Sequence, residues 1–487
     1  MRLRSTHHLL AGIAALLLAA CGGGGGGGVN RAAAVAGTPT TTSGLPAPHS
    51  QCTLSQARED VLNLFEDYYF FNTYPDQVAK YADVRSRLDS FTSVDALLDE
   101  LRYQSGIYDR GFSYYRTVEE VDQYFTAGEF YGFGFSVGIA DSGAWRLMDV
   151  YGGSPADLAG LLRGDTILAV NGTSTASLNL ASESTFGPSE VGVQRTLTIR
   201  HLDGTTVEVT LSKTTVDLDP VPADKVRVFE AGGRLVGYVY FRTFVEDANA
   251  LLRQAMVSLT DQAVALGGTG IDDLVLDLRY NGGGLVGTAE VLGSLVVGNA
   301  NAGNIFFSYE YNDFVTANYG DPNEDVRRFQ VEADALEGVE NVYYLTDTGT
   351  ASASELTISG LTPYLTRSVL VGARTYGKPV GQWGLDYCND SMVLFLVTFR
   401  TVNVLGQADY YTGIPADCAA PDDWDHALGD PSEARLDAAL AYIESNGSLC
   451  TAPVLRAAAQ SLAGAPIVEL PEPLTGSTLA ARFLHAY

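Results

Sequence analysis

The chain has 487 residues, of which 46% are hydrophobic and 18% are charged, so it is long and apolar enough for two or three folded domains. Its 58 acidic and 30 basic residues give a formal net charge of −28 at pH 7. No cluster of lysine and arginine offsets this charge, and such a surface repels nucleic acid and anionic lipid. The composition therefore excludes a nucleic-acid-binding protein.

The first residues have the pattern of an export signal. Arg2 and Arg4 precede the apolar run 9–20, which is too short to span a bilayer as a mature helix. Cys21 follows at once, and the sequence LLAAC resembles a bacterial lipobox, which implies cleavage after residue 20 and lipidation of Cys21. The alternative is an ordinary secretory signal with an incidental cysteine. We expect a lipid-anchored protein of the bacterial cell envelope, on the periplasmic side of the outer membrane.

Residues 21–50 differ in composition from the rest of the chain. They begin with a run of seven glycines after Cys21 and continue with Ala, Thr, Ser and Pro, a composition that cannot bury a core. This segment is expected to be a flexible tether with a reach on the order of 30 Å. Because no other run is apolar enough for a transmembrane helix, membrane attachment is expected through the lipid alone.

Residues 51–127 are expected to form a small N-terminal helical region. Apolar residues recur at helical spacing over 54–105, as in Val61, Leu62, Leu64 and Phe65.

Besides Cys21, four cysteines are available for disulfides in an oxidising compartment. They allow three connectivities, and their positions along the chain favour the pairs Cys388–Cys418 and Cys52–Cys450. A metal site is not expected, because no CxxC or HxxxH spacing occurs, and no cofactor is expected either.

Residues 128–213 change to short strands and turns. The stretch 154–172, SPADLAGLLRGDTILAVNG, reads as a short helix, a Gly-Asp turn, an apolar strand and an Asn-Gly hairpin turn. This order resembles a PDZ domain. The resemblance implies a strand edge that accepts a peptide and a loop that holds its C-terminal carboxylate, formed by Gly132, Phe133, Gly134 and Phe135. The alternative is a small β-domain without a ligand.

From about residue 226 to 447, strands alternate with helices. Strands are expected over 235–244, 273–279, 341–347 and 368–373, and helices over 246–265 and near 287–297. This alternation predicts an α/β domain with a mostly buried sheet. Residues 448–487 match no pattern to which we can assign a role.

The sequence GTASASE (349–355) holds two candidate nucleophiles, Ser352 and Ser354, between a predicted strand and a predicted helix. A serine hydroxyl needs a base, and none of the six histidines has the support of a motif. Lys378 lies in TYGKPVGQ (375–382), after a predicted buried strand. A lysine that is desolvated between apolar walls has a lowered pKa and can act as a base. Taken alone, a lysine in a turn is more often a solvated surface charge.

Together these two motifs resemble the carboxyl-terminal processing, or tail-specific, proteases, which are Ser–Lys peptidases. The resemblance implies that Ser352 is the nucleophile, that Lys378 is the general base, and that Gln382 positions the lysine. Ser354 then becomes a residue of the helix N-terminus whose hydroxyl caps backbone N–H groups. Glu355 complements the positive end of the helix dipole.

A third motif, DLRYNGGG (277–284), resembles the oxyanion-hole loop of the same family. The resemblance implies that Gly283 and Gly284 supply a backbone N–H and that Ala353 supplies a second one. The alternative is a simple glycine-rich loop.

The chain departs from the family's motifs at several positions. Pro379 replaces the glycine after the lysine, Gly282 replaces a proline, and the spacing from Ser352 to Lys378 is slightly longer than usual. The segment 108–120 resembles an N-terminal element of the family, with Gly111 in place of its histidine. None of these changes removes a catalytic group.

The sequence therefore favours an α/β fold: a sandwich-type protease core with an inserted PDZ-like β-domain and a small N-terminal helical region. Its expected function is that of a serine endopeptidase that engages the exposed C-terminal tails of proteins or peptides and cleaves through an acyl-enzyme. One alternative is a catalytically weak or inactive PDZ scaffold that binds peptides. Another is a Ser–His hydrolase, for which the G-x-S-x-G motif is missing.

Overall fold

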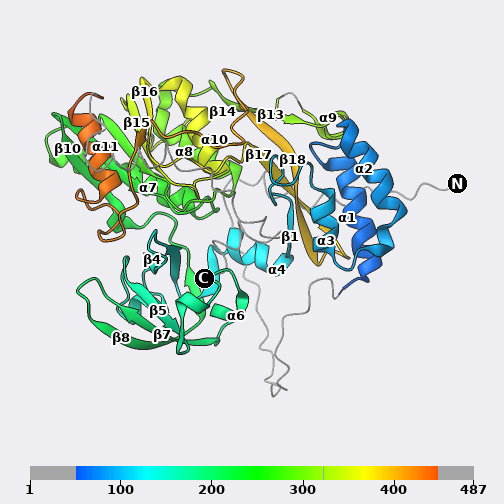
Figure 1. The fold of residues 1–487 in the computed structure, drawn as a ribbon. Coiled ribbons are helices and arrows are strands. Elements are labelled where there is room, and N and C mark those ends of the chain that lie inside the picture. Colours follow the sequence, from blue (N-terminus) through cyan, green and yellow to red (C-terminus); the bar gives the residue numbers. More distant parts are fainter. Residues whose placement is uncertain (1–50, 322, 448–487) are drawn as a thin grey trace, which may run out of the picture.

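The computed structural model describes residues 51–321 and 323–447. Figure 1 shows three parts: N-terminal helices at the right, a β-domain at the lower left, and an α/β core above it. The predicted fold class is confirmed. The predicted signal, Cys21, the tether and residues 448–487 lie outside the described residues.

A six-stranded sheet forms the centre of the α/β core, in the order β10-β11-β12-β15-β16-β19. All its neighbouring pairs are parallel except β10 with β11. Every residue of β12 and β15 is buried, which is why their sequences read as continuous apolar runs. The strands are β10 (Val226–Ala231), β11 (Arg234–Tyr240), β12 (Asp273–Asp277), β15 (Asn341–Thr346), β16 (Arg367–Gly372) and β19 (Cys418–Ala419).

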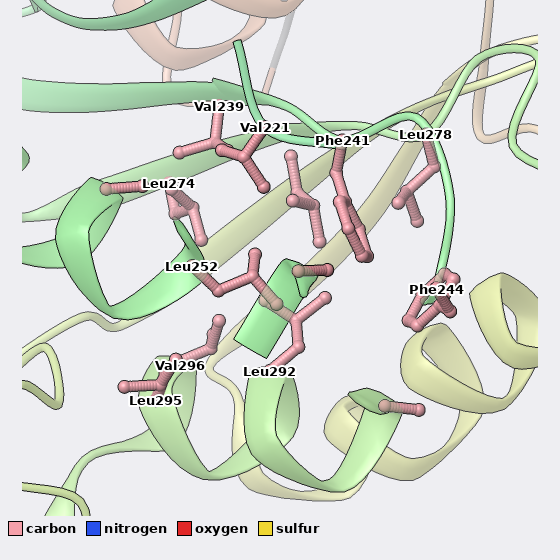
Figure 2. Close-up of a cluster of buried hydrophobic side chains, with 14 of the residues drawn as sticks. Val221, Val239, Phe241, Phe244, Leu252, Leu274, Leu278, Leu292, Leu295 and Val296 are labelled. Atoms are coloured by element: carbon pink, nitrogen blue, oxygen red, sulfur yellow. The ribbon is translucent and has the colours of Figure 1, made fainter. Parts of the chain in front are cut away.

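Helices cover both faces of this sheet. The helices α7 (Ala248–Ala265), α8 (Val286–Val297) and α10 (Ala353–Leu361) share one hydrophobic core with it, and α11 (Ala434–Glu444) packs in a separate core. Figure 2 shows Leu252 of α7, Leu292 of α8 and Leu274 of β12 in one cluster of buried side chains. Burying each such leucine stabilises the fold by roughly 1.5–3 kcal/mol. Among the described residues, no helix is both long and apolar enough to cross a membrane.

A second, antiparallel sheet lies beside the core, and its long hairpin β17–β18 was not among the sequence predictions. The strand order is β1-β18-β13-β14, and β17 pairs with the other side of β18. The N-terminal helices pack on this hairpin in one hydrophobic core, so the beginning of the described chain meets a segment more than 300 residues later there. These elements are α1 (Leu54–Tyr68), α2 (Pro75–Ser86), α3 (Val94–Leu101), β1 (Tyr114–Thr117), β13 (Ile305–Tyr311), α9 (Asp313–Tyr319), β14 (Val326–Arg328), β17 (Val380–Tyr387) and β18 (Met392–Asn403).

The β-domain is a sheet in the order β3-β4-β5-β7-β8, with β6 paired to β5. A two-stranded ribbon, β2 with β9, forms where the chain enters and leaves the domain. The short helix α5 begins after Ser154, whose hydroxyl caps it, as the Ser-Pro signal predicts. Helix α4 (Val118–Val121) precedes the domain and contacts β1 and β18. The elements of the domain and its ribbon are β2 (Glu129–Gly132), β3 (Phe135–Ile139), β4 (Trp145–Val150), α5 (Pro155–Leu158), β5 (Thr166–Val170), β6 (Thr173–Ser174), α6 (Glu183–Phe186), β7 (Gln194–Arg200), β8 (Thr206–Ser212) and β9 (Thr214–Asp217).

The predicted disulfide pairing is wrong. Cys388 bonds to Cys52, and their Cα atoms are 5.2 Å apart. The reason is the unpredicted hairpin: Cys388 lies at its tip, which reaches the start of α1, whereas Cys418 lies on β19 of the central sheet. Cys418 is also disulfide-bonded, and Cys450 lies outside the described residues.

Replacing Cys52 or Cys388 by serine should lower the free energy of unfolding by roughly 2–5 kcal/mol. The bond cross-links residues 336 positions apart, so its loss frees a very large loop in the unfolded chain. Guanidinium denaturation without reductant measures the effect. The double variant should unfold like either single variant, since only one bond is lost. Single variants as stable as wild type would contradict a structural role for this bond.

Candidate active site

The loop after β12 approaches the start of helix α10. Gly283 and Gly284 have φ angles of +99° and +137°, which side chains other than glycine rarely allow. A methyl group at Gly283 would lie 2.8 Å from both the Cβ of Ser352 and the N of Ala353. The structure therefore brings together the glycine pair, Ser352 and Ala353 of the separate sequence motifs.

Asn281 ties this loop to the neighbouring turns. Its amide nitrogen donates to the carbonyl of Phe241 (2.8 Å), and its side-chain oxygen accepts the N–H of Gly283 (2.9 Å). Its own carbonyl accepts the N–H of Ala351 (3.1 Å). The Gly283 N–H is thus already bonded, and the loop is fixed against the residue before Ser352.

The charged residues of the DLR motif lie under this loop rather than in an open cleft. Arg279 is fully buried and pairs with Asp277 (2.6 Å) and with Glu433 (2.7 Å). Burying three charges is tolerated only when each has good partners. This group therefore fixes the backbone that leads to the glycine pair.

The two serines of GTASASE have different environments. Ser352 is partly exposed and stands at the N-cap of α10 with φ +56° and ψ −116°, a strained combination for a side chain other than glycine. Ser354 is 0% exposed, and its hydroxyl donates to the carbonyl of Asn281 (3.1 Å). The expectation that Ser354 caps the helix is therefore wrong, because the helix begins at Ala353 and turns Ser354 toward the loop. Only Ser352 can meet a substrate.

Glu355 joins the serine turn to the lysine turn. Its buried carboxylate accepts the N–H of Ser352 (3.0 Å), as the helix-terminus expectation suggests. It also accepts three donors of the lysine turn: the Thr375 hydroxyl (2.5 Å), the Gly377 N–H (2.7 Å) and the Lys378 N–H (2.8 Å). Burial raises the pKa of Glu355, and these four hydrogen bonds oppose that rise.

Lys378 has the surroundings that a lysine base requires. Its ammonium donates to the side-chain oxygen of Gln382 (2.5 Å) and lies 5.5 Å from the centre of the Phe112 ring. Desolvation lowers the pKa of Lys378 to about 8, although the charges of Asp109 and Glu355 act in the opposite direction. A group with this pKa is partly neutral near pH 7.

Gln382 is itself held from the N-terminal region, since its amide nitrogen donates to the carbonyl of Phe112. In the sequence, the segment 108–120 carries only a resemblance to a family element, and Phe112 has no predicted role. The resemblance could have drawn attention to this segment. It could not show that the segment packs on β17 and so brings Phe112 to Gln382.

No hydrogen bond directly joins the Ser352 hydroxyl to the Lys378 ammonium among residues 51–321 and 323–447. A direct proton transfer therefore requires the two side chains to approach. The histidines in this part of the chain, His201 and His426, pair instead with Asp165 (2.9 Å) and Asp423 (2.7 Å). In the same residues, no cluster of His, Cys, Asp and Glu could hold a metal ion.

The predicted carboxylate loop of the β-domain connects β2 to the edge strand β3. Phe133 and Phe135 are fully buried, and their rings stack with centres 6.0 Å apart. Gly134 has φ +82°, and a methyl group there would lie 2.0 Å from the Cβ of Ser154. The loop backbone is thus held by its side chains on one side and by Ser154 on the other.

Comparisons with known proteins match two parts of this chain. Residues 235–419 match the model of peptidase family S41, and residues 147–184 match that of the PDZ domain. The chain is 29% identical over 304 residues to a carboxyl-terminal-processing protease of Synechocystis sp., covering 61% of this chain and 62% of that protein. It is 27% identical over 284 residues to a chloroplastic C-terminal processing peptidase of Tetradesmus obliquus, covering 56% of each. The chain thus spans less than two thirds of these relatives.

Among solved structures, a Bacteroides fragilis protein described as an S41 protease superposes with a TM-score of 0.58 at 23% identity. The superposition covers 79% of this chain and 97% of that one, which shows a shared fold.

Proposed function

We propose that this chain, which contains a peptidase family S41 domain and a PDZ domain, is a serine endopeptidase with a Ser–Lys mechanism. The observation that carries the proposal is the contrast at helix α10. Ser352 is partly exposed and lies beside the glycine pair. Lys378, whose pKa is about 8, belongs to a turn that shares the Glu355 carboxylate with the Ser352 N–H.

In the proposed reaction, neutral Lys378 takes the proton of the Ser352 hydroxyl as its oxygen attacks the substrate carbonyl. The resulting ammonium then protonates the leaving amine, and an ester remains on Ser352 until water, deprotonated by the same lysine, hydrolyses it. Gln382 keeps the amine in place through its 2.5 Å hydrogen bond.

The developing oxyanion needs backbone N–H donors near Ser352. Ala353 begins helix α10 next to the nucleophile and supplies one of them. Because the Gly283 N–H is donated to Asn281, Gly284 is the glycine whose N–H we assign as the second donor.

The PDZ domain suggests how substrates are selected. A loop backbone at Gly132–Phe135 next to the edge strand β3 suits a peptide that adds as a strand and ends in a free carboxylate. Both relatives are named for carboxyl-terminal processing, so we propose proteins with exposed C-terminal tails as the substrates.

Replacing Ser352 by alanine should abolish cleavage of a dye-labelled unfolded protein and labelling by a fluorophosphonate. Replacing Lys378 by alanine should also block labelling, because the hydroxyl then lacks its base. For wild type, kcat/KM should rise about tenfold per pH unit up to about pH 8 and then level off, since the neutral amine is the active form.

Ser354→Ala is the matched control: it removes a buried hydroxyl and leaves Ser352 in place, so both labelling and cleavage should persist. Full activity in Ser352→Ala would contradict the assignment. An intact wild type that binds peptides, neither cleaves nor is labelled, and shows no pH response would instead favour a peptide-binding scaffold.

Replacing Gly134 by alanine should weaken peptide binding by about tenfold or more, because the added methyl group displaces the loop from Ser154. The measurement is fluorescence anisotropy of a labelled casein peptide on the Ser352→Ala background, with a free or an amidated C-terminus. In the Ser352→Ala parent, amidation of the peptide should lower its affinity by about as much as the Gly134→Ala change does. In the variant that also carries Gly134→Ala, amidation should lower the affinity little further. Equal affinity for both peptides in the parent would exclude carboxylate recognition.

We also propose that the protein is exported and anchored to the bacterial cell envelope by a lipid on Cys21, in support of which the sequence offers LLAAC after an apolar run. In a bacterial host, radioactive palmitate should label wild type and not Cys21→Ser, which should be released from the membrane fraction. Labelling of both proteins would contradict lipidation at Cys21.

A further inference from the structure

We propose that Arg110 is a positioning residue for the catalytic lysine, because it clamps the lysine turn (375–378) to the N-terminal helical region. This inference rests on the proposed function and adds a residue to which no motif assigns a role.

Arg110 contacts the lysine turn at three points. One guanidinium nitrogen, Nη2, donates to the carbonyls of Tyr376 (2.8 Å) and Gly377 (2.9 Å). The guanidinium carbon lies 4.4 Å from the centre of the Tyr376 ring, within the range of a cation–π contact. Such a contact fixes a planar side chain and a short stretch of backbone together.

Arg110 and Glu355 hold opposite polar groups of the same turn. Glu355 accepts the N–H of Gly377, and Arg110 donates to the carbonyl of Gly377. Gly377 has φ +95°, and a methyl group there would lie 2.5 Å from the carbonyl oxygen of Tyr411. The peptide units on both sides of Gly377 are therefore held, and Lys378 is the next residue.

Residues next to Arg110 in the sequence act on the lysine amine. Phe112 faces the ammonium with its ring and holds Gln382 with its carbonyl. Asp109 is buried, accepts the hydroxyls of Tyr69 (2.8 Å) and Ser113 (2.7 Å), and acts on Lys378 through its charge. Arg110 is thus the link that keeps the turn against this wall.

Loss of the Arg110 contacts should change the pKa of Lys378, which a lower free energy of unfolding alone would not do. The charges that act on Lys378 are those of Asp109 and Glu355, and both raise its pKa, so its lowered value depends on desolvation. If the turn moves away from Phe112, water reaches the amine and the pKa of Lys378 rises toward its ordinary value. Less of the lysine is then neutral at pH 7.

The test compares Arg110→Met and Arg110→Lys with wild type in the full chain. Arg116→Met is a matched control, since Arg116 also donates to a backbone carbonyl, that of Tyr115 (2.9 Å), and lies 5.0 Å from the ring of Tyr114. Dye-labelled casein gives kcat and KM between pH 6 and 10, a fluorophosphonate gives the rate of serine labelling, and thermal melting reports the fold.

In Arg110→Met, kcat at pH 7 should fall about 10–100-fold with KM nearly unchanged, as expected when a catalytic group is displaced. The rising part of its kcat–pH curve, the pH limb, should shift to higher pH by about one unit, so that kcat recovers partly at alkaline pH. Arg110→Lys keeps a cation that can donate to a carbonyl but loses the planar group that lies over the Tyr376 ring, so its effect should lie between those of Arg110→Met and wild type. Arg116→Met should keep the wild-type limb.

An unchanged pH limb in folded Arg110→Met would overturn the proposal. So would an unfolded Arg110→Met accompanied by a wild-type limb in Arg110→Lys, because Arg110 would then act on folding alone. Failure of the proposed function is distinguishable, since wild type itself would then neither cleave casein nor react with the fluorophosphonate.

Discussion

The buried carboxylate of Glu355 joins the turn that carries Ser352 to the turn that carries Lys378. Its four donors are the Ser352 N–H, the Thr375 hydroxyl and the N–H groups of Gly377 and Lys378. An unpaired buried carboxylate would cost several kcal/mol, so the anion stabilises the fold only while all these donors converge on it. The two turns therefore behave as one unit, although β16 separates them in sequence.

A second set of bonds attaches the glycine loop to this unit. The carbonyl of Asn281 accepts the Ala351 N–H and the Ser354 hydroxyl, on either side of Ser352. The loops after β12, β15 and β16 thus meet at one edge of a buried parallel sheet, where loops commonly carry functional groups on a rigid frame. That frame holds Ser352 at a strained φ of +56°, which an isolated turn would relax.

The sequence predicted those parts whose signal is local. Apolar runs indicated β12 and β15, and the motifs around Ser352, Lys378 and Gln382 indicated residues that the structure does place around one site. Contacts between distant segments left no such pattern. The pairing of Cys52 with Cys388 depends on where the β17–β18 hairpin folds, and the direction of the Ser354 hydroxyl depends on a carbonyl 73 residues away. The sequence predicts Glu355 as a charge at a helix terminus, but its three hydrogen bonds to the lysine turn are tertiary contacts that leave no local pattern.

The proposed role of Lys378 as the base explains why the N-terminal helices belong to the candidate site. A histidine titrates near neutrality in water, whereas a lysine must be desolvated, and desolvation requires walls on every side of the amine. Here one wall is Phe112, which also bonds Gln382, and it lies outside the residues that match family S41. The segment with Phe112 packs with α1 on the β17–β18 hairpin, and the Cys52–Cys388 disulfide joins the start of α1 to the tip of that hairpin. The environment of Lys378 therefore depends on the N-terminal helical region and the β17–β18 hairpin, whereas Ser352 is positioned by the loops of the central sheet and by Glu355.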